Sequence, residues 1–166
     1  HGHNNGSLEV IQLACTFLEY NQKEYALKWY LPRYLKDLKP DYNPFYRNLK
    51  NNVQEGSPSD KFLWQKEIVV TGKDSNGFGY LMDLRPANYS EFTAFTKRRE
   101  HFANPKVVIM AAIHIVEAFR DLHKKGYSYQ DLNPGNFFID KDSGDVLICD
   151  NDNVAPDGVN LGVAGM

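Results

Sequence analysis

The chain has 166 residues, of which 42% are hydrophobic and 24% charged, and its formal net charge is -2. These values are typical of one globular domain or two small lobes, and they give no reason to expect a nucleic-acid partner. The longest apolar run, residues 107–113, is far too short to cross a bilayer, so no membrane span is expected. Cys15 and Cys149 fit no metal-binding spacing, which favours free thiols in a reducing compartment and a cytoplasmic location.

The first half of the chain has the pattern of an antiparallel sheet with one helix. Residues 8–18 and 23–31 are rich in β-formers on either side of a polar dipeptide, which predicts a hairpin. Residues 62–71 and 78–84 predict two further strands. Between the two pairs, residues 41–55 carry apolar side chains at helical spacing and predict a short helix.

The second half changes to longer helical segments. Residues 90–101 predict a helix capped by a serine, and residues 105–125 predict a longer one that ends at a glycine. The longer helix is apolar nearly all round in its first half, as is typical of a buried helix. A short hairpin is expected from residues 137–140 and 145–149, and the tail from 151 to 166 shows no periodicity.

Three segments carry residues suited to chemistry. Lys28 lies in the middle of a predicted strand between apolar neighbours, where a cation is costly unless it has an anionic partner. Asp131 and Asn136 lie five apart in a tight loop, so a carboxylate that orients a hydroxyl and a neutral oxygen ligand for Mg²⁺ can converge. Asp150 follows an apolar strand, and a strand end is a rigid place to hold a metal ligand.

Each segment also has a purely structural interpretation. Lys28 alone is compatible with an edge-strand lysine that points to water. The loop around Asn133 is compatible with a turn rich in Asx residues, and Asp150 with a carboxylate that caps a turn. A plain α+β domain would need all three segments to coincide by chance.

Taken in order, the segments resemble the protein-kinase signature of a lysine in a small-lobe strand, an H-R-D-L-x-x-x-N loop and then D-F-G. The resemblance covers about residues 12–158 and is closest to bacterial serine/threonine protein kinases. It implies an α+β fold with an antiparallel β N-lobe and one helix at residues 1–84. An incomplete, mainly helical C-lobe would follow at residues 85–166, with the catalytic loop at 129–136 and the metal-binding segment at 150–152.

The resemblance implies a role for each matched residue. Lys28 would bind the α- and β-phosphates of ATP, and Asp131 would act as the catalytic base facing the acceptor hydroxyl. Asn136 and Asp150 would hold Mg²⁺ against the phosphates. The implied activity is ATP- and Mg²⁺-dependent phosphoryl transfer to a hydroxyl, with Ser or Thr of a protein substrate as the first choice of acceptor.

The adenine side of the site is implied by the segment Tyr80-Leu81-Met82-Asp83-Leu84, which resembles the strand and hinge that contact adenine. Met82 would be the gatekeeper. Backbone groups of Asp83 and Arg85 would face the base.

Two departures concern the nucleotide site. The glycine-rich loop is missing from residues 8–13, where backbone N–H groups would approach phosphate. The helix that should supply a glutamate to Lys28 has no carboxylate between Asn43 and Gln54, and Arg47 stands in that region. These departures favour the alternative of a pseudokinase that acts as a nucleotide-binding or protein-interaction module.

Two further departures concern the loops. Tyr129 and Gln130 replace the His-Arg of H-R-D, and the D-L-N-x-G-N loop is similar to those of small-molecule kinases, which keeps a small-molecule acceptor open. Asp152 replaces the glycine of D-F-G and adds a carboxylate that suits either the metal site or a turn cap.

The chain stops soon after the metal-binding segment, whereas a whole kinase domain continues into further helices that bind the substrate. The helix at residues 105–125 would then lose much of its packing surface. We therefore expect exposed apolar area on it and self-association or a partner at that face.

Overall fold

The computed structural model describes residues 18–20, 23–30, 43–70 and 77–161, and the structural statements below refer to these residues. Residues 8–17 of the predicted first strand lie outside them. The remainder of the predicted hairpin is present, since β1 (Leu18–Tyr20) pairs antiparallel with β2 (Lys23–Tyr30).

The first half forms a four-stranded antiparallel sheet in the order β1-β2-β4-β3. β4 (Phe78–Asp83) lies between β2 and β3 (Gln65–Val70), with Lys28 of β2 opposite Tyr80. The two further strands predicted for this half, at residues 62–71 and 78–84, are therefore confirmed, although β3 begins three residues later than expected. This sheet positions Lys28 on a central strand flanked on both sides.

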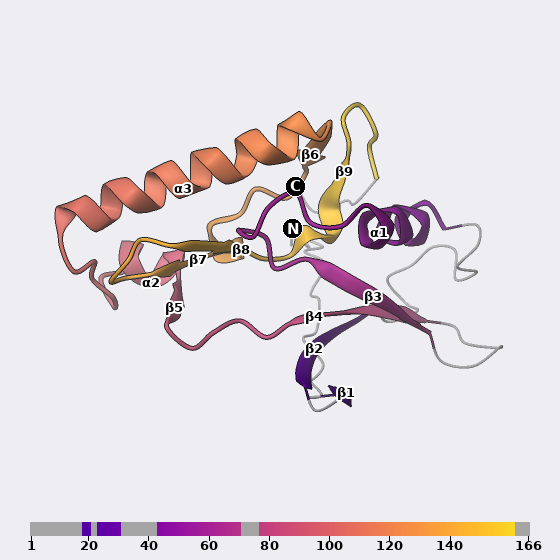
Figure 1. The fold of residues 1–166 in the computed structure, drawn as a ribbon, viewed down its shortest axis with the longest axis horizontal. Helices are drawn as coiled ribbons and strands as arrows, with labels where there is room; N and C mark the ends of the chain where they lie inside the picture. The colour runs from indigo at the N-terminus through magenta and orange to yellow at the C-terminus, as the bar shows by residue number, and fades with distance from the viewer. Residues whose placement is uncertain (1–17, 21–22, 31–42, 71–76, 162–166) are drawn as a thin grey trace, which may run out of the picture.

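A small aromatic core joins this sheet to α1 (Pro44–Glu55). Figure 1 shows the course of the helix and of the sheet strands. Asn43 caps the helix, since its side chain accepts hydrogen bonds from the backbone N–H groups of Phe45 and Tyr46. Leu49 is fully buried against the rings of Phe78 and its neighbours. The predicted helix is thus confirmed, with its apolar stripe facing the sheet.

Five short strands and a long helix dominate the described second half. β5 (Tyr89–Glu91), β7 (Phe137–Asp140) and β8 (Val146–Ile148) form one antiparallel sheet. β6 (Tyr127–Tyr129) pairs with β9 (Val154–Pro156) in a second. The described part of the second half is therefore mixed α and β rather than mainly helical.

The long helix α3 (Pro105–Lys124) runs along one side of these strands (Figure 1). Its inner face buries Ala118 and Leu122 in the larger of the two cores. The backbone of Gly144, in the β7–β8 turn, lies so close to α3 that a Cβ there would come within 2.6 Å of the carbonyl oxygen of Val107. The predicted hairpin and the predicted long helix thus pack directly against each other.

Two predictions for the second half are wrong in detail. Residues 90–101 do not form one helix, because Ser90 lies in β5 opposite Ile139 and only α2 (Phe92–Thr96) is helical. Pairing with a buried neighbouring strand outweighs the capping preference of a single serine. The tail after Asp150 is not irregular throughout, because β9 pairs with β6, and a contact so distant in sequence leaves no periodicity in a short segment.

The outer face of α3 remains apolar and open. Val108, Ile109, Ile113 and Val116 are 45%, 61%, 44% and 68% exposed. This confirms the expected exposed apolar area. Among the described helices, none combines the length and the hydropathy that a membrane crossing requires.

Candidate functional site

Lys28 does not point to water. Its ammonium contacts the carboxylates of Asp150 and Asp152, the latter with an Nζ–Oδ2 distance of 2.7 Å. These residues lie 122 and 124 positions further along the chain. Only 11% of the lysine side chain is exposed. The sequence interpretation of an edge-strand lysine in solvent is therefore wrong, and the costly buried cation has two anionic partners.

The two carboxylates differ in their surroundings. Asp150 follows β8 in a left-handed backbone conformation with φ of 57°, and 30% of its side chain is exposed. Asp152 lies in the 3₁₀ turn Asn151–Asn153, and 3% of its side chain is exposed. The hydroxyl of Tyr30 donates to the same Asp152 oxygen that Lys28 contacts. One carboxylate thus faces the opening of the site and the other is enclosed.

Charge follows the same division. Burial by itself would raise the pKa of Asp152, but Lys28 and the Tyr30 hydroxyl lower it below its ordinary value. Burial and the neighbouring Asp152 raise the pKa of Asp150 to about 7 despite Lys28. Burial would lower the pKa of Lys28, and the two aspartates together raise it. At neutral pH, Asp152 and Lys28 therefore form the fixed ion pair.

The catalytic-loop candidates Asp131 and Asn136 are brought together. The amide nitrogen of Asn136 donates to the Asp131 carbonyl oxygen at 3.1 Å and to its carboxylate at 3.4 Å. Asn133 shapes the turn between them, since its side-chain oxygen accepts from the N–H of Gly135 at 2.8 Å. The conformational interpretation of Asn133 is thus correct, while the Asp131–Asn136 pair has the convergent arrangement expected of a site.

The loop is tied to the segment that carries Asp150. The backbone N–H of Cys149 donates to the carbonyl oxygen of Asn136 at 2.8 Å. The Tyr129 hydroxyl donates to the carbonyl oxygen of Cys149 at 2.7 Å and to that of Asp150 at 3.3 Å. Tyr129, which stands in place of the H-R-D histidine, therefore fixes the loop against the strand end.

The donor set suits a hard cation that needs few protein ligands. The Asn136 amide nitrogen is engaged with Asp131, so its oxygen is the atom left for a cation. Asp150 adds a carboxylate oxygen from the adjoining strand end. The described residues contain no group of three His, Cys, Asp or Glu side chains suited to a metal. Oxygen ligands completed by water and phosphate oxygens are typical of Mg²⁺ sites, so Asn136 and Asp150 are the residues that would hold such an ion.

The adenine-side candidates lie at the other end of the sheet. Met82 pairs with the buried Ala26 across β4 and β2. The Asp83 carboxylate is bound by Lys23 at 2.9 Å and by Lys66 at 2.7 Å.

Arg85 is held separately. Its guanidinium lies 4.4 Å from the centroid of the Phe138 ring and donates to the carbonyl oxygen of Tyr89. Phe138 belongs to β7, which directly follows the loop of Asp131 and Asn136. The contact therefore joins the segment after β4 to the β7 strand of the second half.

Sequence reasoning missed the position of Asp152 and missed Tyr30 altogether. Lys28 and Tyr30 are two residues apart on one strand and so share a face, which is a signal that was available. Arg47, which stands in the region where the resemblance implies a glutamate, is exposed. The inward residues Asn48 and Asn52 donate to the carbonyl oxygen of Val154 at 2.7 and 2.8 Å.

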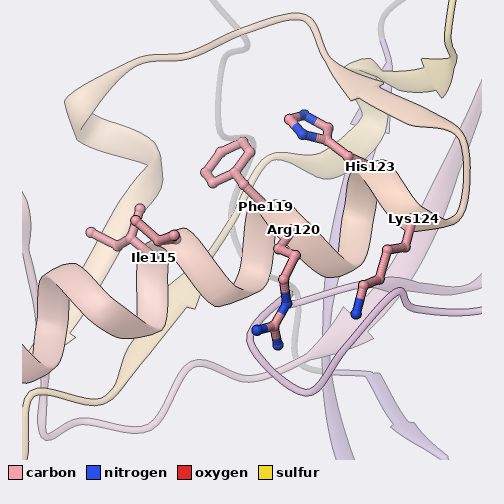
Figure 2. Close-up of a pocket in the computed structure, with 6 residues that line it drawn as sticks. Ile115, Phe119, Arg120, His123 and Lys124 are labelled. Atoms are coloured by element: carbon pink, nitrogen blue, oxygen red, sulfur yellow. The ribbon is translucent and has the colours of Figure 1, made fainter.

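An open hollow runs along the last turns of α3 and is separate from the predicted site. Figure 2 shows Ile115, Phe119, Arg120, His123 and Lys124 projecting from this helix. None of the residues proposed from the sequence lines it. It is a surface feature of α3 and not a nucleotide cleft.

No protein-family model matches the sequence, and no curated protein matches it. Among solved structures, the crystal structure of Rad53 1–466 in complex with AMP-PNP matches with a TM-score of 0.57 and 19% identity. The match covers 81% of this chain and 33% of that one, so the chain spans about a third of its length. At this identity the likeness concerns the fold, which is a partial kinase-like fold with antiparallel sheets and few helices.

Proposed function

We propose that this chain carries the nucleotide-binding and catalytic segments of an ATP- and Mg²⁺-dependent phosphotransferase. The observation that carries the proposal is the contact between Lys28 and Asp150, which joins a strand of the first sheet to the end of β8 across 122 positions. The Asp131–Asn136 pair adjoins that strand end through the Asn136–Cys149 backbone bond. Rad53 was crystallised with an ATP analogue, which supports a nucleotide as the ligand of this fold.

The residues divide the work of phosphoryl transfer, which is mainly positioning and charge neutralisation. Lys28 binds phosphate oxygens, and Asn136 and Asp150 supply the oxygen ligands for Mg²⁺. Mg²⁺, when bound, neutralises phosphate charge. Asp131 orients the acceptor hydroxyl and accepts its proton at the carboxylate.

A Ser or Thr side chain of a protein is the acceptor that we favour, and a small-molecule hydroxyl is the alternative. Leu132, next to Asp131, is 69% exposed and offers an apolar contact to an extended polypeptide. The acceptor belongs to the whole protein, because the chain spans about a third of the matched structure.

A second candidate is a pseudokinase that binds nucleotide without turnover. It is supported by the absence of a carboxylate between Asn43 and Gln54, so that no acidic side chain inside α1 is available to Lys28. The two candidates share nucleotide binding and differ in phosphoryl transfer.

The first experiment is a thermal shift of this chain with millimolar ATP, with and without Mg²⁺. A ligand that binds only the folded state raises Tm, and at a hundred times its Kd the gain is about 2.7 kcal/mol. We expect a Mg²⁺-dependent rise that Asp150→Asn removes. Asp142→Asn, at an exposed turn, is the matched control and should keep the rise. If ATP raises the Tm of the wild-type chain neither with Mg²⁺ nor without it, the proposal is contradicted.

A further inference from the structure

We infer that Asp152 is a positioning residue that holds Lys28 for the nucleotide phosphates, in place of the carboxylate that α1 lacks. The inference rests on the proposed function. It assigns the two aspartates of the Asp150-Asn151-Asp152 segment to different tasks.

The helix side of the lysine is closed to an acidic partner. The acidic residue of α1, Glu55, is the last of the helix and is exposed. The residues that α1 buries are Asn48, Leu49 and Asn52. The two asparagines are bonded to the carbonyl oxygen of Val154, so α1 is attached to the segment after Asp152 by amides. The carboxylates that pair with Lys28 are therefore those of Asp150 and Asp152 and do not come from α1.

Asp152 is held as a fixed partner should be. Its Oδ2 accepts from both Lys28 and Tyr30, which share one face of β2. The other oxygen, Oδ1, is buried and has no hydrogen-bond partner among the described residues. The bonds from Lys28 and Tyr30 are therefore the ones that offset the cost of burying this carboxylate. The preceding residue is anchored as well, since the Asn151 amide donates to the carbonyl oxygens of Leu63 and Ile148, both at 2.9 Å.

Asp150 has the opposite character. Ten times more of its side chain is exposed than of Asp152, at 30% against 3%. When Asp150 turns toward a cation, Lys28 keeps its bond to Asp152 and stays in place. The position of the lysine is then set by the segment after β8, and it does not depend on a movement of α1.

The competing role for Asp152 is that of a second metal ligand, and the two roles differ without metal. A metal ligand acts only when Mg²⁺ is present, whereas a residue that acts through Lys28 affects phosphate binding in either case. The test is a double-mutant cycle of Lys28→Met and Asp152→Asn, with ADP binding measured by calorimetry in EDTA and again in Mg²⁺.

We expect Asp152→Asn to weaken ADP binding in EDTA about tenfold, the effect of one lost charge-assisted contact. Lys28→Met should have a similar effect, and the double variant should bind no more weakly than Lys28→Met alone. Asp142→Asn is the matched control and should bind as the wild type does. Tyr30→Phe removes the second donor to Asp152 and should weaken binding about two- to threefold, less than Asp152→Asn does, because Asp152 keeps its bond to Lys28. This variant carries the test if Asp152→Asn does not fold.

Four outcomes would overturn the inference. A loss confined to the Mg²⁺ condition would make Asp152 a metal ligand. If the two single effects on ADP affinity multiply in the double variant, Asp152 acts independently of Lys28. If the wild-type chain binds ADP and Asp152→Asn binds it equally well, the inference fails and the proposed function stands. If the wild-type chain binds no ADP in either condition, both fail.

Discussion

Two regions of this molecule handle burial in opposite ways. Around Lys28, charged groups are buried and bonded to one another, with 11% of the lysine side chain and 3% of the Asp152 side chain exposed. On the outer face of α3, apolar groups are exposed, and Val116 reaches 68%. Each arrangement is costly alone, since a buried charge needs a partner and an exposed apolar stripe needs a cover.

The difference shows which surfaces of the described chain are complete. The charges of this cluster are paired within the chain, because β2 and the segment after β8 bring opposite charges together. The apolar face of α3 has no such counterpart among the described residues. We therefore expect association at the outer face of α3 and not at the Lys28 cluster.

The largest effect should come from the centre of the catalytic loop. Asp131→Asn removes the proposed proton acceptor and should lower phosphoryl transfer by about 10²–10⁴-fold, the usual contribution of a general base. Transfer from labelled ATP measures this, and the Mg²⁺-dependent thermal shift should persist because Asp131 is not among the proposed phosphate ligands. Loss of the shift together with activity would instead indicate a structural role for Asp131.

The next effect concerns the inner face of α3. Leu122 is fully buried, so Leu122→Ala should reduce the free energy of unfolding by about 2–5 kcal/mol through lost transfer energy and a cavity. Urea denaturation monitored by tryptophan fluorescence measures it. A cost below 1 kcal/mol would show that α3 is loosely attached and that the contrast between its two faces is overstated.

An intermediate effect is expected at Asp145, which lies just before β8 and bonds to residues outside the β7–β8 hairpin. The Asp145 carboxylate accepts from Lys61 at 2.6 Å and from the Tyr89 hydroxyl at 2.5 Å. Burial would raise its pKa, but these donors lower it below the ordinary value. Its stabilisation is therefore present above the unfolded-state pKa and lost as pH falls through the folded-state pKa.

Asp145→Asn should accordingly cost about 1–2 kcal/mol at pH 7, within the range for hydrogen bonds to charged groups. The difference from wild type should shrink below about pH 4, where the unfolded carboxyl begins to protonate. Urea midpoints at pH 7, 5 and 3.5 test this, with Asp142→Asn as control. A difference that is constant with pH would mean that the loss comes from packing and not from charge.

The smallest effect on stability should come from the outer face of α3. Ile109→Ser and Val116→Ser together should change the free energy of unfolding by no more than about 0.5 kcal/mol per site, as is usual for surface positions. They should nevertheless shift the chain from associated species to monomer in analytical ultracentrifugation. A wild-type chain that is already monomeric at high concentration would contradict the expected self-association.

Much of the architecture could be predicted because it depends on local pattern. Alternation predicts β2, helical spacing predicts α1, and the glycine after Lys125 predicts the end of α3. Residues 90–101 were misassigned because Ser90 has a good local reason to begin a helix. Ser90 instead pairs with Ile139 of β7, which lies almost fifty residues further along the chain.

The sequence by itself determined the candidate residues Lys28, Asp131, Asn136 and Asp150, because their types and order suffice to suggest phosphate, proton and cation chemistry. Only the tertiary structure decided how they are supported. By sequence, Asp152 suits either a metal site or a turn cap, and the fold encloses it against Lys28 and Tyr30. Burial, which decides whether a carboxylate is a fixed counter-ion or a free ligand, is a property of contacts across more than a hundred positions, and no local pattern encodes it.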